Sequence, residues 1–438
     1  MKSFKANTVG LIGFALSLVT VNKLNAQSEL PAPAPAQQQA IYLTHATIHL
    51  GDGRVLNNAT IGFDKGKIVF LEENPSFKTD ETLGQVIDCN GKHIYPGIIA
   101  AETKIGLDEI EAVRATNDYA EVGQYNADAR AIIAYNTDSR VTPTVRSNGV
   151  LYAQSCPQGG TVSGTSAVVQ LDAWNWEDAL VKEDGVWMNW PSMFRMKGWW
   201  GEPQGFEMSK DYDKNVEEIK NYFKEAKAYA AGKHDKVNLR FEAMRGLFDK
   251  TKTLYVNAGY VKEMLNVVSF AEELGVNLVI GGAKDSYLIA DILAQKKVGV
   301  ILDNPHSLPA YDEDDIVQPY KTPAVLQKAG VMFCITIPGV FWQERNLAFE
   351  AGTAVAYGLT KEQALASITS NAAKILRVDD KIGTLEKGKE ASLIVSSGDV
   401  LDMKTSNIEK AYISGRQIDL SNKQKTLNEK YLKKYGLN

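Results

Sequence analysis

The two ends of the sequence carry short stretches in which hydrophobic and polar residues alternate, which is the period of a half-buried β-strand. Between residues 41 and 97 these stretches are IYLTHATIHL (41–50), ATIGFDKGKIVFL (59–71) and QVIDCNGKHIYPG (85–97). The sequence DKGK (64–67) interrupts the second of them, which predicts a β-hairpin. The same pattern of short strands and turns occurs again at 383–398 and 408–418. We therefore predict one small β-sandwich domain built from residues 41–95 and 380–420.

The middle of the sequence alternates short apolar runs with longer helical patterns. Its clearest part predicts three strands and the two helices between them, in the order TLYVNAG (253–259), YVKEMLNVVSFAEELG (260–275), VNLVIGG (276–282), DSYLIADILAQKK (285–297) and VGVILDN (298–304). Residues 322–337 add a helix and a strand, and 345–378 add two helices, with Thr360 as N-cap of the second. Parallel strands joined by crossover helices produce this order. We predict an α/β fold with a (β/α)8 TIM barrel over residues 96–379, close to the roughly 250 residues typical of that fold.

The stretch from 174 to about 250 fits the barrel pattern least well, and we predict that it is an insertion. Six of the seven tryptophans fall within it, namely Trp174, Trp176, Trp187, Trp190, Trp199 and Trp200. Such a density is compatible with a surface that stacks sugars or docks a protein. It is equally compatible with large rings that pack an insertion with little core of its own. Residues 421–438 are predicted to form a helical tail.

The first 26 residues have the layout of a secretory signal peptide. Lys2 and Lys5 precede an apolar run from about Val9 to Val21, and Ala26 precedes the expected cleavage site. That run is shorter than the roughly 20 residues that a membrane span requires. Residues 27–40 (QSELPAPAPAQQQA) read as a Pro/Ala/Gln-rich linker. We expect a secreted or periplasmic protein with no membrane span.

Charge and cysteine content narrow the possible partners. The formal net charge of −5 means that the chain as a whole does not attract nucleic acid or an anionic membrane. Cys89, Cys156 and Cys334 are far apart and odd in number, whereas an exported disulfide scaffold carries more cysteines in an even number. We therefore expect a partner that is a small molecule or a protein, and cysteines that are buried and reduced.

Three motifs make the chain similar to the amidohydrolase superfamily, and more narrowly to its imidazolonepropionase-like members. They are GKHIYPGII (91–99) at the entry to the barrel, AGTAVAYGLTKEQALASITSNAAKIL (351–376) near its exit, and DKIGTLEKGKEASLIV (380–395) on the return to the β domain. Ser392 stands where the last pattern usually has aspartate. The resemblance implies a TIM barrel of the metal-dependent hydrolase type. It also implies hydrolysis of C–N bonds in cyclic amides, peptides or related small molecules by water bound to Zn²⁺ or another divalent metal.

The resemblance also implies where the metal ligands would lie, and the sequence departs from that pattern. The His-x-His position after the entry strand is Glu102-Thr103-Lys104, and the strand TLYVNAG offers Asn257. The other two strand ends carry Gly281-Gly282 and Ile337-Pro338-Gly339. Of the five histidines, only His306 follows a predicted barrel strand. We expect no hydrolytic metal here, and the candidate pocket residues at the former ligand positions are Glu102, Lys104, Asn257 and His306.

Several alternatives remain open at the level of sequence. An oxygen-rich metal site could form around Glu102, Asp303 and the YDEDD loop (311–315), although that loop is predicted to be a solvated acidic loop and lacks the ligand spacing of an EF-hand. Alternation along a strand puts Glu102 and Lys104 on one side, as a structural ion pair or with Lys104 as an anion-binding or nucleophilic residue.

Two functions follow from these observations. The first is an exported C–N hydrolase with reduced or lost activity. The alternative is a non-catalytic binding or scaffolding subunit of a periplasmic or surface complex. The sequence leaves the oligomeric state open, although relatives of this fold are often oligomeric.

Overall fold

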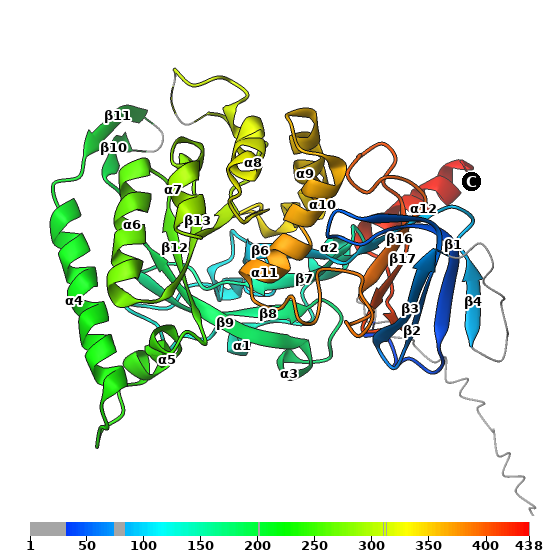
Figure 1. The fold of residues 1–438 in the computed structure, drawn as a ribbon, viewed down its shortest axis with the longest axis horizontal. Coiled ribbons are helices and arrows are strands. Elements are labelled where there is room, and N and C mark those ends of the chain that lie inside the picture. Colours follow the sequence, from blue (N-terminus) through cyan, green and yellow to red (C-terminus); the bar gives the residue numbers. More distant parts are fainter. Residues whose placement is uncertain (1–31, 74–83, 200–201, 310, 312, 438) are drawn as a thin grey trace, which may run out of the picture.

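The structure is a computed structural model, and it describes residues 32–73, 84–199, 202–309, 311 and 313–437. The predicted signal peptide and the first residues of the predicted linker lie outside the described residues. The chain folds into a sheet domain at one end and a barrel with its surrounding helices at the other (Figure 1). Each part has its own buried apolar core. No helix in the described part of the chain is long and apolar enough to cross a membrane.

The sheet domain is assembled from both chain ends, as predicted. Its strands follow the order β18-β17-β16-β5-β1-β2-β3, and β4 pairs with β1. Their bounds are β1 Ile41–His49, β2 Val55–Asp64, β3 Lys67–Glu73, β4 Gln85–Asp88, β5 His93–Pro96, β16 Leu393–Ser396, β17 Ile408–Ile413 and β18 Arg416–Gln417. The predicted hairpin is β2–β3, with Lys65 and Gly66 at positive φ in its turn. The strands form one continuous sheet that folds over its core, where the rings of Phe63 and Tyr412 meet at 5.0 Å.

The barrel is a nearly closed eight-stranded sheet in the order β15-β14-β13-β12-β9-β8-β7-β6. Its strands are β6 Ile98–Thr103, β7 Val150–Ser155, β8 Val162–Gln170, β9 Leu180–Asn189, β12 Thr253–Ala258, β13 Asn277–Gly282, β14 Gly299–Leu302 and β15 Phe333–Ile335. The predicted TIM barrel is confirmed, with the three strands between 253 and 304 in adjacent parallel register. Strand β8 differs from the simple pattern, because it runs antiparallel to both of its neighbours. The Thr336 hydroxyl donates to the Ala101 carbonyl and links the two ends of the barrel sheet.

Helices cover the outside of the barrel and flank its ends (Figure 1). The α-helices are α1 Ala131–Ala134, α2 Thr142–Arg146, α3 Trp176–Ala179, α4 Tyr212–Ala231, α5 Leu239–Phe248, α6 Val261–Leu274, α7 Ala290–Gln295, α8 Gln318–Ala329, α9 Leu347–Ala356, α10 Lys361–Ser367, α11 Ser370–Ile375 and α12 Lys423–Tyr435. Three 3₁₀ helices are η2 Arg114–Thr116, η3 Ser286–Leu288 and η4 Phe341–Asn346. Helix α10 begins at the predicted N-cap, where the Thr360 hydroxyl accepts from the Gln363 backbone N–H.

The stretch predicted as an insertion contributes to the barrel. Strand β9 lies within it and pairs with β8 and β12. The buried Trp187 of β9 stacks on Tyr255 at 4.9 Å, so this aromatic residue packs the barrel interior. Only the part after Asn189 leaves the barrel, as a two-stranded ribbon of β10 (Phe194–Trp199) and β11 (Glu202–Met208) followed by α4 and α5. The predicted start of the insertion at 174 is therefore too early, because β9 carries Lys182, Glu183 and Asp184 in its first half and does not read as a continuous apolar strand.

Candidate functional site at the barrel mouth

The parallel barrel strands end on one face, and their last residues bring polar side chains together there. This face is where TIM barrels carry their active sites. Glu102 lies at the end of β6, Asn189 ends β9, Asn257 lies near the end of β12, and Asp303 follows β14. The mouth is therefore built from residues that are distant in sequence and adjacent in the sheet.

Glu102 has a strained backbone and a buried side chain. Its φ is +49°, a left-handed conformation that residues other than glycine rarely adopt. The register of β6 against β7 shifts at this point, and the Glu102 N–H donates to the Gln154 side-chain oxygen at 3.1 Å. Only 6% of Glu102 is exposed. The irregular strand end therefore aims a carboxyl group into the closed interior of the mouth.

Two buried side-chain oxygens lie beside Gly281. Within the described structure, Glu102 Oε2 and Asn257 Oδ1 have no hydrogen-bond donor. Both lie over Gly281, since a β-carbon there would come within 2.9 Å of the first and 2.4 Å of the second. The Asn257 amide nitrogen is already committed, because it donates to Asn189 Oδ1 at 3.2 Å. A protonated Glu102 would be a hydrogen-bond donor, whereas the ionised carboxylate can only accept.

Burial and neighbouring carboxyl groups favour that protonated form. Burial first, and then the charge of Asp303, raise the pKa of Glu102 well above its ordinary value, against a smaller opposing effect from Asn257. Burial also raises the pKa of Asp303, to about 6. The pKa values of both acids are therefore raised, and proton transfer in either direction is the chemistry that such a carboxyl pair can supply.

A third carboxyl group lies behind this pair. Glu344 in η4 is fully buried, and among the described residues neither of its carboxylate oxygens has a hydrogen-bond partner. Burial and then the charges of Glu102 and Glu350 raise its pKa well above the usual range. Glu350 in α9 continues the series and meets His306, whose Nδ1 lies 2.9 Å from Glu350 Oε1. The series Asp303, Glu102, Glu344 and Glu350 is called here the acid row.

Lys104 takes a different direction from the one predicted. Its ammonium group lies 3.1 Å from Asp108 Oδ2 and 4.6 Å from the centre of the Tyr119 ring. The predicted ion pair with Glu102 is therefore wrong among the described contacts. The reason is the positive φ of Glu102, which breaks the alternation on which that prediction rested. The Lys104–Asp108 pair is almost completely buried and fills the space between the mouth and the loop that carries Tyr119.

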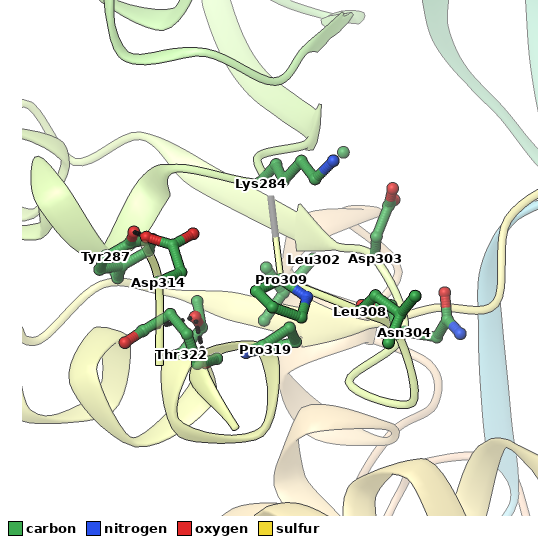
Figure 2. Close-up of a pocket in the computed structure, with 13 residues that line it drawn as sticks. Lys284, Tyr287, Leu302, Asp303, Asn304, Leu308, Pro309, Asp314, Pro319 and Thr322 are labelled. Atoms are coloured by element: carbon green, nitrogen blue, oxygen red, sulfur yellow. Dashed lines mark hydrogen bonds between the residues drawn. The ribbon is translucent and has the colours of Figure 1, made fainter. Parts of the chain in front are cut away.

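A small cavity opens beside Asp303. Figure 2 shows Asp303 and Lys284 at its edge, with Tyr287 and Asp314 along one wall. The cavity has a volume of about 40 Å³, enough for two or three water molecules. Asp314 belongs to the YDEDD loop and accepts from the Tyr287 hydroxyl at 3.2 Å. Two members of the predicted oxygen-rich site, Asp303 and Asp314, therefore line the same cavity.

Comparisons with known proteins match this architecture. Residues 337–418 match the model of the amidohydrolase family. The crystal structure of an amidohydrolase from Thermotoga maritima MSB8 is similar over 86% of this chain and 99% of that chain, with a TM-score of 0.74 and 24% sequence identity. The chain has the amidohydrolase fold. The resemblance drawn from the three sequence motifs is thus confirmed.

More distant solved structures share the fold. The crystal structure of a prolidase complexed with N-methylphosphonate-L-proline is similar over 87% of this chain and 100% of that chain, with 15% sequence identity and a TM-score of 0.52. An adenosine deaminase from Xanthomonas campestris with bound zinc covers 92% of this chain and 99% of that chain at 14% identity, with a TM-score of 0.53. A search of the curated proteins found no match to the sequence.

The side chains at this mouth do not fit the usual metal centre of the amidohydrolase fold. His45, His49 and His93 belong to the sheet domain, and His234 stacks on Tyr229 beyond the end of α4. His306 is held by Glu350 and by Thr353, whose hydroxyl lies 2.6 Å from His306 Nε2. In the described part of the chain, no group of three histidine, cysteine or acidic side chains could hold a metal ion. The expectation that no metal binds stays a prediction.

The structure adds site residues that the sequence did not reveal. Glu344 lies in a 3₁₀ helix after the last barrel strand, and Gln154 and Asn189 end strands that no motif marks. Their only sequence signal was a polar residue at the end of an apolar run. The four predicted pocket residues divide into two groups: Glu102 and Asn257 meet over Gly281, whereas Lys104 and His306 contact other partners.

Replacing Gly281 by alanine tests the close packing of these two oxygens over the backbone. The added methyl group would overlap Asn257 Oδ1 and Glu102 Oε2. We expect a loss of about 1–3 kcal/mol in the free energy of unfolding, as for overpacked interiors. The matched control is Gly259→Ala, where a β-carbon would meet only Lys284 Cβ at 3.8 Å. Urea unfolding measures both variants, and equal stability of the two would contradict this description of the site.

Proposed function

We propose that this chain hydrolyses C–N bonds of small molecules at the barrel mouth, with low activity that does not depend on the usual metal centre. The observation that carries the proposal is the Glu102–Asp303 pair, two neighbouring acids at the ends of barrel strands whose pKa values are both raised by burial. The amidohydrolase fold, and the prolidase and the adenosine deaminase among its structural neighbours, support C–N bonds as the substrate class.

The pair can supply both proton transfers that amide hydrolysis requires. At pH 7 Asp303 is largely ionised and can take a proton from water in the adjoining cavity as that water attacks the carbonyl carbon. Burial raises the pKa of Glu102 and so favours its protonated form, which can donate a proton to the leaving nitrogen as the C–N bond breaks. The products are a carboxylic acid and an amine. A bound divalent metal would add polarisation of the carbonyl, but these side chains do not provide its usual ligands.

An assay of the purified full-length chain tests this proposal. Dipeptides and cyclic amides are incubated with the protein in a chelator, and again with Zn²⁺, Mn²⁺ or Co²⁺, and released amine is measured. We expect slow turnover that survives the chelator and falls at least 100-fold in Glu102→Gln and Asp303→Asn. The matched control is Glu109→Gln, a half-buried acid that bonds Asn136 and Ser139 away from the acid row. Tightly held metal with chelator-sensitive turnover would refute metal independence.

A non-catalytic binding or scaffolding role is the second candidate. The observation that favours it is the closure of the mouth, since Glu102, Lys104 and Glu344 are nearly inaccessible. Absence of turnover on every substrate class, with or without metal, would support this role.

We also propose that the chain is exported, on the basis of Lys2, Lys5 and the apolar run before Ala26. The N-terminus of the protein recovered from its native cells tests this, with Gln27 as the expected first residue.

A further inference from the structure

The ribbon of β10 and β11 stands at the end of the molecule opposite the sheet domain (Figure 1). The two strands pair with each other from Phe194↔Met208 to Trp199↔Glu202. In the sheets of the described residues, no third strand joins them. A two-stranded ribbon by itself is marginally stable in water unless further strands or a helix cover its apolar face. We therefore expect another element or molecule to cover the apolar face of this ribbon.

One face of this ribbon is apolar and exposed. Phe194 lies opposite Met208, and Met196 lies opposite Phe206, so that the four side chains share one face. Their exposed fractions are 36%, 63%, 43% and 72% in that order. Phe194 makes an edge contact with Tyr260 at 5.1 Å, which anchors the base of the ribbon on α6. This set of four side chains is called here the ribbon face.

The opposite face of the ribbon carries charged side chains that already pair with each other. Arg195 lies directly opposite Glu207, and its Nε donates to Glu207 Oε1 at 2.6 Å. The ribbon as a whole carries two basic and two acidic side chains, Arg195, Lys197, Glu202 and Glu207. Its charges therefore cancel, although the whole chain carries a net charge of −5. A second copy of this chain can approach here without the repulsion that its net charge would create elsewhere.

We propose that the ribbon face packs against the same face of a second copy of the chain, in a two-fold dimer. The surface is self-complementary in character, since apolar side chains meet apolar side chains and the charged faces stay in water. The balanced charge of the ribbon offers no attraction for an anionic membrane or a nucleic acid. Packing of the two ribbons also gives each one the apolar cover that a two-stranded sheet lacks.

The size of the ribbon face sets the expected strength of the dimer. With about 200 Å² for each fully exposed Phe or Met side chain, the four exposed fractions sum to roughly 400 Å² of apolar surface per copy. A standard interface buries roughly 800 Å² per partner. The ribbon face supplies about half of that area, and the flanking ribbon residues must supply the rest. We therefore expect a reversible dimer with a dissociation constant in the micromolar range.

Sedimentation of the purified chain across a concentration series tests the proposal. We expect a monomer–dimer equilibrium in the wild type and at least a tenfold weaker dimer in the double variant Phe206→Ser, Met208→Ser. The matched control is Arg195→Gln, Glu207→Gln on the other face of the same ribbon, which should dimerise like the wild type. A wild-type chain that stays monomeric, or a dimer that the two apolar substitutions leave unchanged, overturns the proposal. Wild-type monomers that float with neutral lipid vesicles overturn it in favour of a membrane.

A cross-linking experiment locates the contact. The three natural cysteines, Cys89, Cys156 and Cys334, are buried and form no disulfide in the described structure, so they do not interfere. We expect Phe206→Cys to form a disulfide-linked dimer on mild oxidation, whereas Arg195→Cys on the opposite face should remain monomeric. Equal cross-linking of the two variants would overturn a dimer through the ribbon face. Neither experiment depends on catalysis, so the proposal stands or falls independently of the hydrolase function.

Discussion

Replacement of Asp172 by alanine is expected to lower the free energy of unfolding by about 3–5 kcal/mol, because it leaves buried arginine without its counter-charge. Asp172 follows β8, and its side chain is fully buried. Its two carboxylate oxygens accept hydrogen bonds, one from Arg146 Nη1 at 2.6 Å and the other from Arg416 Nη1 at 3.0 Å. Oxygen Oδ2 also accepts from the Ala34 backbone N–H at 2.9 Å. One carboxylate thus holds together the barrel, the last strand of the sheet domain and the N-terminal segment.

The Arg146 guanidinium makes this cost large. Burial lowers the pKa of Arg146 even though Asp172 and then Asp419 favour its charged form. Among the described residues, its Nε and Nη2 already have no acceptor. Without Asp172 the buried cation would keep only the Leu171 carbonyl, 3.0 Å from Nη1.

An exposed pair with the same chemistry provides the control. Arg130 and Glu183 form two hydrogen bonds of 2.7 and 2.9 Å, with both side chains partly in solvent. Because solvent screens exposed pairs, Glu183→Ala should cost about 0–1 kcal/mol. Urea unfolding at pH 7 measures both variants. A similar loss in the two would show that burial of Asp172 contributes nothing.

The fold was predictable where the residues obey local rules. The hairpin turn at Lys65-Gly66 and the N-cap at Thr360 act through neighbouring residues, and both were found where the sequence indicated. The antiparallel direction of β8 depends on how it pairs with other segments of the chain. The alternation of residues within one strand does not predict that direction. Strand β9 was missed for a related reason, since Trp187 reads as part of an aromatic cluster until it is seen stacked on Tyr255.

The candidate site was predictable only in part. The motif at barrel entry placed Glu102 at the mouth, and strand ends placed Asn257 and Asp303 nearby. The positive φ of Glu102 was not predictable, and it is this backbone angle that turns Lys104 toward Asp108. Glu344 joins the acid row through η4, and a glutamate in a 3₁₀ helix has no pattern that separates it from a surface residue.

Removing the charge of the acid row should flatten the pH dependence of stability. An acid whose pKa is raised in the folded protein binds its proton more tightly there than in the unfolded chain. Its contribution to stability is complete below the ordinary pKa and is lost as the pH rises through the folded pKa. For Asp303 that window runs from its ordinary value of 3.8 to about 6, and for Glu102 it begins at 4.5 and ends well above that ordinary value.

Glu102→Gln and Asp303→Asn each remove one such contribution. We expect both variants to match the wild type near pH 4 and to become relatively more stable as the pH rises. The Asp303→Asn gain should level off above pH 6 at on the order of 2–3 kcal/mol, whereas the Glu102→Gln gain should begin to appear as the pH rises through 4.5. Denaturant unfolding at intervals between pH 4 and pH 9 measures these curves. Curves that run parallel to the wild type would mean that neither acid is protonated more readily in the folded protein.

The pH curves also bear on function through their relation to activity. Replacing a residue that only supports the fold lowers the stability of the protein. Replacing a strained, charged group that is kept for chemistry raises that stability. Glu102 combines the left-handed backbone, the orphaned oxygen and the raised pKa in one side chain. If Glu102→Gln is more stable than the wild type at pH 8 and has lost turnover, the cost of keeping this acid buried is explained by its use in proton transfer. A gain in stability with unchanged turnover would leave Glu102 as a remnant of the ancestral site.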